Sequence, residues 1–192
     1  MPTMPTKPAS PKLAAIKGAE KKASMHTKTE SLAERWERVK DLSTESAERL
    51  ATAHELAVEL VAQGRYVEAE EMGREVLPFQ MRLHGEEHPN SLAAAGNMAI
   101  ALLGQGRHEE AELLEHEILT VLKRLYGDEH PDTLASAGNL AICIFDQGRH
   151  DEAKAILKDV LDAQKRTKGE SHPDTLSAIA MMAKLDTIRQ AS

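Results

Sequence analysis

The sequence repeats itself at intervals of 42 residues, and this period constrains the fold more than any other feature. Residues 85–126 and 127–168 share 20 of 42 positions in an alignment without gaps. A third copy begins at Gly169, and an earlier, more diverged copy covers about residues 43–84. A fixed period of this length is typical of repeat architectures, in which each unit packs mainly on its neighbours. The chain is therefore expected to form an array of similar units.

Each repeat is predicted to contain two helices, because apolar residues recur at helical spacing and show no alternation typical of strands. The predicted first helices cover about 45–62, 89–104, 131–146 and 173–189, and the predicted second helices about 66–83, 108–125 and 150–167. The short Gln-Gly-Arg turn within each repeat makes the two helices antiparallel. Two pairs of equivalent alanines, Ala99 with Ala141 and Ala111 with Ala153, would let helix backbones approach closely.

A His-Pro pair opens each copy, at His88, His130 and His172, and raises the question of a metal or catalytic site. Proline suits the first turn of a helix, and the residue before proline avoids the helical region. The glycine three residues before each histidine suits the left-handed end of the preceding helix. Successive His-Pro turns should lie one repeat apart, too far to share an ion. We therefore expect helix punctuation and no metal site.

The spacing of glycine and alanine in "QGRHEEA" resembles the tetratricopeptide repeat signature. Together with "HPDTL", "NLA" and the 42-residue period, it resembles the kinesin light chain type of that repeat over residues 43–189. HEAT repeats and propeller blades have similar lengths but lack this spacing. The resemblance implies an all-α fold, a right-handed α-solenoid of antiparallel helix pairs. The repeats would occupy about 43–84, 85–126 and 127–168, with a half repeat at 169–189, in a domain of residues 43–192.

The N-terminal residues differ in composition from the repeats. Residues 1–28 are rich in lysine, and we expect a disordered basic tail. An organelle transit peptide is the alternative, although arginine is absent. Residues 29–42 place Leu32, Trp36 and Val39 on one helix face. We expect a capping helix that covers the first repeat with Trp36 as its anchor; the alternative is that Trp36 docks into a groove.

Composition disfavours several classes of function. The net charge is −7, and residues 1–30 carry six lysines against two glutamates, which leaves −11 on the remainder. An acidic body with few aromatic residues argues against a nucleic acid partner. The single cysteine, Cys143, rules out a disulfide framework and a thiolate metal cluster. No apolar run approaches the roughly 20 residues that span a bilayer, so we expect no membrane insertion and a cytoplasmic location.

No catalytic motif stands out. A Gly-rich phosphate loop and a Gly-x-Ser-x-Gly sequence are both missing. The repeat period accounts for most of the histidines, and of the others only His54 is placed on the expected groove. No pair of carboxylates is singled out in so acidic a chain. We therefore expect neither enzymatic activity nor a cofactor.

The resemblance implies a concave groove lined by the first helix of each pair. In this sequence the groove positions are Ala51, His54, Glu55, Val58 and Val61; Ala93, Gly96, Asn97, Ile100 and Leu103; Ala135, Gly138, Asn139, Ile142 and Phe145; and Ser177, Ala180, Met181 and Lys184. Family grooves carry basic residues that grip acidic peptides or a C-terminal carboxylate. Here only Lys184 is basic and Glu55 is negative, so the groove favours a helix or an apolar extended segment.

Asn97 and Asn139 occupy the same register of two repeats. Asparagine is a mediocre helix former, so its recurrence in the middle of a helix suggests a role. In the family, asparagines here hold the backbone of a bound peptide, and an amide can donate and accept hydrogen bonds at once. The alternative is an asparagine that bridges neighbouring helices.

These patterns predict a protein–protein interaction module, an adaptor that binds a peptide or helix of a partner in the groove. The alternative is a self-assembling scaffold, a homo-oligomer formed through the groove or the end faces. The half repeat would leave Met182, Leu185 and Ile188 uncovered unless it acts as a cap, the array is truncated, or another chain covers it.

Overall fold

The computed structural model describes residues 32, 34–42 and 46–191. The helices with defined bounds are α2 (Ala47–Ala62), α3 (Tyr66–His84), α4 (Pro89–Gly104), α5 (His108–Tyr126), α6 (Pro131–Asp146), α7 (His150–Lys168) and α8 (Pro173–Ala191). Their ends lie within two residues of the predicted ones, and the part of the chain described contains no strand. The basic tail predicted for residues 1–28 lies outside the described residues.

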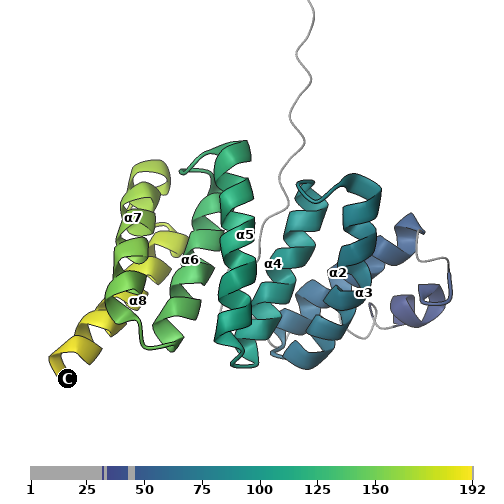
Figure 1. Ribbon diagram of the computed structural model, residues 1–192, viewed down its shortest axis with the longest axis horizontal. Helices are drawn as coiled ribbons and strands as arrows, with labels where there is room; N and C mark the ends of the chain where they lie inside the picture. Colours follow the sequence, from purple (N-terminus) through teal and green to yellow (C-terminus); the bar gives the residue numbers. More distant parts are fainter. Residues whose placement is uncertain (1–31, 33, 43–45, 192) are drawn as a thin grey trace, which may run out of the picture.

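The helices stack in antiparallel pairs along one direction (Figure 1). Each helix packs on the helix before it and the helix after it. In addition, the first helices of successive pairs touch one another, α2 with α4 and α4 with α6, whereas the second helices make no comparable contact. The first helices are therefore closer together, and they form the inner side of an all-α solenoid.

The His-Pro turns are helix punctuation, as predicted, and the histidine has a defined role in them. Its imidazole Nδ1 accepts a hydrogen bond of 3.2 Å from the backbone N–H two residues later, in His88, His130 and His172 alike. The preceding glycines, Gly85, Gly127 and Gly169, have the expected positive φ, between 86° and 93°. Their ψ of 158° to 169° differs from the left-handed helical conformation, so this part of the prediction was wrong.

Small residues bring the paired helices together. Ala99, Ala111, Ala141 and Ala153 are each at most 1% exposed. Larger apolar side chains from neighbouring helices pack around them, such as Leu140 and Leu157 beside Ala153. The four alanines are thus buried, as a close approach of the helices requires.

A short helix precedes α2, and residues 34–39 belong to it. Leu32 and Val39 are buried, and Trp36 packs against apolar residues of α2 and α3, including Leu56 and Met72. Of the two interpretations of Trp36, contact with the first repeat is the one observed. The helix ends at residue 39, before the predicted position 42, because residues 40–42 form a turn.

The C-terminal end exposes a different face from the predicted one. Leu185 is only 3% exposed and packs with residues of α6 and α7, and Met182 lies partly buried against the same cluster. The exposed apolar residues are Leu176 and Ile179, at 52% and 38%. They occupy the positions that the second helix covers in the preceding repeats, whereas Leu185 lies on the side of α8 that faces the array. The side chain of Ile188 is outside the described residues.

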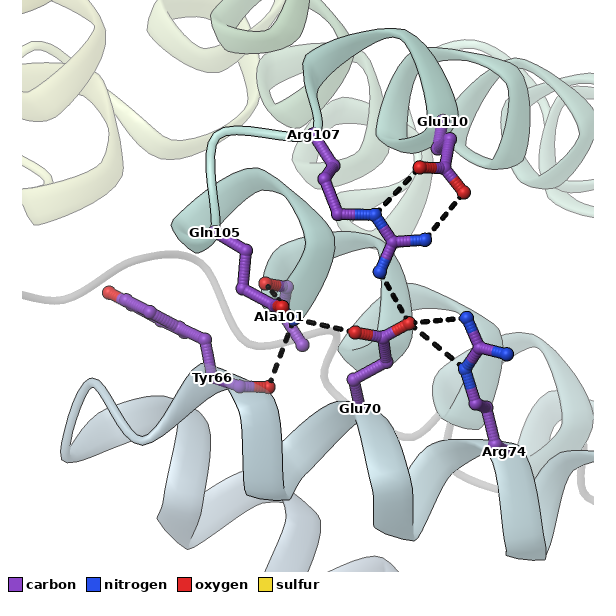
Figure 2. A network of polar contacts seen from close by, with 7 residues as sticks. All are labelled: Tyr66, Glu70, Arg74, Ala101, Gln105, Arg107 and Glu110. Carbon is purple, nitrogen blue, oxygen red and sulfur yellow. Dashed lines mark hydrogen bonds and ion pairs between the residues drawn. The ribbon is translucent and has the colours of Figure 1, made fainter.

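A polar network joins α3 to the turn after α4 (Figure 2). Glu70 accepts hydrogen bonds from Gln105 Nε2 at 2.7 Å, from Arg107 Nη1 at 2.6 Å and from Arg74 Nη2 at 2.7 Å. Arg107 also pairs with Glu110 at 2.6 Å. We call these five residues the Glu70 network. Because it links the second helix of one repeat to the turn of the next, it fixes how successive pairs stack.

The same linkage recurs at the next interface. Glu112 on α5 accepts hydrogen bonds from Gln147 at 2.6 Å and from Arg149 at 2.8 Å. The equivalent position on α7 is Lys154, which pairs with Asp186 of α8. The Gln-Gly-Arg turn therefore does more than reverse the chain, since its polar side chains attach each repeat to the one before.

Candidate functional site: an inner cleft between α6 and α8

An open cleft lies between α6 and α8 on the inner side of the stack, and α7 forms its floor. Its volume is about 380 Å³ and its wall is mostly apolar. We call it the inner cleft. It is lined by Pro131, Leu134, Ala135, Gly138, Asn139, Ile142, Leu157, Val160, Gln164, Lys168, Asp174, Ser177, Ala178 and Met181.

Six residues predicted for the groove meet in this cleft. They are Ala135, Gly138, Asn139 and Ile142 from α6, and Ser177 and Met181 from α8. They come from two first helices that are separated by one repeat in sequence, and the stacking of pairs brings them to one surface. Their contact with a partner stays a prediction.

Small side chains keep the inner cleft open. A Cβ atom added at Gly138 would meet no atom within 4 Å, so the wall has room there. At the rim, Lys168 Nζ lies 2.7 Å from Asp174 Oδ2, and this ion pair cancels both charges. The cleft therefore suits an uncharged, apolar ligand and offers little to attract a strongly acidic one.

Asn139 is bound to a carboxylate buried behind the inner cleft. Its Nδ2 donates to Glu115 Oε1 at 2.9 Å, and Ser136 Oγ donates to Glu115 Oε2 at 2.7 Å. Glu115 belongs to α5, and its side chain is 1% exposed. We call these three residues the Glu115 network. The bridging of neighbouring helices, which the sequence left as the alternative for asparagine, is what Asn139 does within the protein.

Burial dominates the electrostatics of Glu115. Removal from water raises the pKa of its carboxyl group to about 7, although the hydrogen bonds from Ser136 and Asn139 act in the opposite direction. The thiol of Cys143 on the same interface is also buried, and burial together with the charge of Glu115 raises its pKa to about 12. The thiol is thus protonated at neutral pH, which fits the packing role expected for Cys143.

A second amide borders the inner cleft. Gln164 on α7 is 7% exposed, and its Oε1 has no hydrogen-bond partner within the described part of the chain. A buried oxygen without a donor carries a cost in free energy, because it has left water without replacing the lost hydrogen bond. A ligand that brought a donor to this atom would remove that cost.

Other predicted groove residues do not open onto the inner cleft. In the second repeat, Ala93, Gly96, Asn97, Ile100 and Leu103 are all buried. In the third, Phe145 is 7% exposed and lies beneath Lys184, whose Nζ is 4.9 Å from the ring centre. The structure therefore does not bring these residues together with the cleft-lining ones, and a role for them in binding stays a prediction.

The first repeat presents a polar surface. His54 is partly buried, and loss of water contact lowers its pKa. Glu55 is exposed and accepts a hydrogen bond from Arg35 of the N-terminal helix at 2.8 Å. Arg35 also donates to Thr52, so it attaches the N-terminal helix to α2. The negative charge noted at this groove position is thus already paired.

Sequence reasoning missed Glu115, Gln164 and Lys168, because it looked for groove residues only on the first helices. One signal was available. The position of Glu115 corresponds to Gly73 and Leu157 in the flanking repeats, so a charge stands where the other repeats have small or apolar residues. An ionisable residue out of phase with its repeat indicates a specific polar partner.

A family model described as tetratricopeptide repeat matches residues 48–124, 116–163 and 132–189, which together make up well over half of the chain. The chain belongs to the tetratricopeptide repeat family. Tetratricopeptide repeats generally mediate protein–protein interaction and are typically not enzymes. Among curated proteins, none matches this tetratricopeptide repeat chain significantly.

Solved structures show the type of repeat. A Podosopora anserina protein, designated a provisional kinesin light chain with nearly identical tetratricopeptide-like repeats, has a TM-score of 0.69 at 29% identity, over 89% of this chain and 83% of its own. A single-residue variant of that protein has a TM-score of 0.70 at 29% sequence identity, over 89% of this chain and 82% of its own. BtubC (BKLC) from P. vanneervenii has a TM-score of 0.69 at 18% sequence identity, over 86% of this chain and 66% of its own, and it shares the fold. The tetratricopeptide repeats of this chain are of the kinesin light chain-like type.

Two further findings concern what the described residues contain. No group of three histidine, cysteine, aspartate or glutamate side chains among them is arranged to hold a metal ion. No helix among them has both the length and the apolar character needed to cross a membrane.

Proposed function

We propose that the protein is an adaptor that holds an uncharged, apolar segment of a partner protein in the inner cleft. The observation that supports it most is the cleft itself. An open surface of about 380 Å³, mostly apolar, coincides with six groove residues that the sequence had singled out. Small side chains admit a ligand, while Asn139 and Gln164 supply the few polar atoms that orient one.

The charge pattern supports an uncharged ligand. Lysine and arginine clusters are the usual means of gripping acidic motifs. In the inner cleft the only basic side chain is Lys168, and Asp174 neutralises it. The basic groove typical of acidic cargo is not present in this cleft.

The first experiment is a selection of binding peptides from a random displayed library, using the full chain as bait. We expect apolar peptides whose affinity falls at least about tenfold in Gly138→Leu, because the new side chain fills the cleft. Ala155→Leu is the matched control, since it adds a similar side chain at an exposed site on α7. Equal affinities for the two variants would place the binding site elsewhere.

The double substitution Asn97→Ala with Asn139→Ala is a second test of binding. The sequence alone predicts loss of binding with an almost unchanged helical melt. Because Asn139 donates to Glu115, its removal leaves a buried carboxylate short of one hydrogen bond, and the melt should fall as well. Gly138→Leu separates binding from stability more cleanly.

Self-assembly is the second candidate, and the exposed face of α8 supports it. Leu176 and Ile179 are exposed, whereas the equivalent Leu134 and Ala137 are covered by α7. A helix from a second copy of this chain would bury the same kind of surface. We expect Leu176→Lys with Ile179→Lys to abolish any rise in mass with concentration, measured by light scattering. A wild-type mass of one chain at all concentrations would reject self-assembly.

A further inference from the structure

The contacts of Asn139 determine which of its atoms a ligand can reach. Its donor group, Nδ2, is used inside the protein by Glu115 at 2.9 Å. Within the described residues, no hydrogen bond reaches its oxygen, Oδ1. Glu115 takes one of the two N–H groups on Nδ2, and the two branches of a planar amide point apart, so the oxygen lies on the side away from Glu115 and is the branch that we assign to the inner cleft.

The second amide of the cleft adds another acceptor independently. Gln164 Oε1 is buried and has no donor among the described residues. The inner cleft is thus lined by two residues with such an amide oxygen, Asn139 from α6 and Gln164 from α7, in a wall that is mostly apolar. Each oxygen is a hydrogen-bond acceptor, so it needs a donor group, such as N–H or O–H, from the ligand.

We propose that Glu115 is a positioning residue that sets the hydrogen-bonding direction of the inner cleft: by holding Nδ2 of Asn139 it turns the amide oxygen outward, so that the cleft selects a ligand that donates N–H groups. This inference rests on the binding role proposed above. Glu115 itself lies behind Asn139 and touches no ligand, because it is 1% exposed.

The direction of these hydrogen bonds decides whether the ligand is a helix or an extended segment. The backbone N–H groups along the side of a helix are already bonded within that helix, and only those of its first turn are free. An extended segment has free backbone N–H groups along its length. The occupant of the inner cleft is therefore an extended, apolar segment of a partner protein, with backbone N–H groups directed at Asn139 and Gln164.

This arrangement occurs at one interface of the described array. Between α3 and α4, the positions equivalent to Glu115 and Ser136 hold Gly73 and Ala94, and between α7 and α8 they hold Leu157 and Ala178. Neither pair can fix an amide. Asn97, at the same register as Asn139, thus lacks a carboxylate behind it, and it serves as an internal reference.

Ionisation of Glu115 controls how firmly Asn139 is held. An ionised carboxylate can only accept hydrogen bonds, which requires Asn139 to present Nδ2, whereas a protonated one also carries a donor. The polar groups that face it are Ser136 and Asn139 on α6, together with the Cys143 thiol. On α5 itself, Glu112 lies one turn earlier and pairs with Arg149 and Gln147. The amide should therefore respond to pH near 7, the pKa of the buried carboxyl group.

The first test needs no ligand. The side-chain amide resonances of Asn139 are followed by NMR between about pH 5 and 9 in the full chain. We expect an inflection near pH 7 in the wild type, and none for Asn97. The double variant Glu115→Leu with Ser136→Ala should lose this inflection, because it has no carboxyl group behind Asn139. The same variant carries the Leu and Ala pair found at the next interface, Leu157 and Ala178, so the fold should persist. Identical Asn139 resonances in wild type and double variant would overturn the proposal.

The second test uses a peptide recovered in the selection described above. Each backbone N–H of that peptide is replaced in turn by N-methyl. We expect at least about a tenfold loss of affinity at one or two positions with the wild type, and less than about threefold with the double variant. Equal losses with the two proteins would overturn the positioning role.

Glu115→Gln is the conservative rescue. Glutamine keeps an oxygen for Asn139 and places its amide against Ser136, so sensitivity to N-methylation should return while the pH inflection stays absent. If the rescue variant behaves like the leucine variant in binding, the proposal fails. If the selection recovers no peptide at all, the proposed function fails, and the Asn139 resonances alone still decide whether Glu115 holds the amide.

Discussion

The glutamates Glu70 and Glu115 each join successive repeats of this solenoid, and their surroundings shift the pKa values of their carboxyl groups in opposite directions. Glu70 and Glu115 are both buried, at 6% and 1% exposure, and both contact the helix pair that follows. Burial raises the pKa of each carboxyl group. At Glu70 the hydrogen bonds from Gln105, Arg107 and Arg74 outweigh it and lower the pKa to about 2. At Glu115 burial prevails, and the pKa rises to about 7.

The difference teaches that the donors and the depth of burial together decide what a buried carboxylate does. Arginine supplies charge as well as hydrogen bonds, so Glu70 stays ionised and strengthens the contact between repeats. Ser136 and Asn139 supply hydrogen bonds alone, so ionised Glu115 carries the cost of an unpaired buried charge. The first arrangement stabilises the stack, whereas the second gives up stability while it orients Asn139.

The largest predicted effect tests the Glu115 side of this comparison. A raised pKa means that the folded chain binds the proton more tightly than the unfolded chain. This stabilisation is complete below about pH 4.5 and is lost as pH rises through about 7. Relative to wild type, Glu115→Gln should therefore gain about 3 kcal/mol of unfolding free energy between pH 4 and 8, measured by urea denaturation. Parallel stability curves would contradict the assignment.

The next effect has the opposite sign and tests Glu70. Its pKa is lowered, so its stabilisation is present above about pH 4.5 and is lost as pH falls toward about 2. We expect Glu70→Gln to reduce the unfolding free energy by about 1–2 kcal/mol at neutral pH, since Arg74 is largely exposed and solvent screens the pair. The deficit should shrink in acid. A deficit that is independent of pH would mean that charge contributes little to the Glu70 network.

The smallest effect compares the two networks in salt. Screening weakens contacts between charges near the surface far more than contacts in the interior. At about 1 M NaCl the stability difference between wild type and Glu70→Gln should fall by roughly half, to below about 1 kcal/mol. The difference between wild type and Glu115→Gln should change by less than about 0.5 kcal/mol. Equal salt responses would remove the distinction between the two networks.

Much of the fold could be predicted from local patterns. The 42-residue period, the His-Pro turns and the Gln-Gly-Arg turns placed the helices from α2 to α8 within two residues of their observed ends. These signals act over a few neighbouring residues, since proline and glycine restrict or release the backbone where they stand. The exposed face of α8 was predicted wrongly, because Leu176 and Ile179 stand at positions that a second helix covers in the preceding repeats, whereas Leu185 packs against α6 and α7.

The candidate site divides in the same way. Six groove residues could be named from their register on the first helices, and they meet in the inner cleft. The register alone could not show that Ala93 and Ile100 are buried while the equivalent Ala135 and Ile142 border an opening. Residues of the second helices were also missed, since Gln164 and Lys168 reach the cleft only through the stacking of pairs.

By itself, the sequence determined the helices, their pairing and the family, because a repeated pattern of turn residues and small apolar residues specifies one supersecondary unit many times over. The tertiary structure alone decided the state of the polar side chains between repeats. Glu70 and Glu115 are the same residue on the same kind of helix. Except for Arg74, the donors that face them come from the next repeat, so the stacking of that repeat contributes to which carboxylate stays charged and which one is protonated near neutral pH.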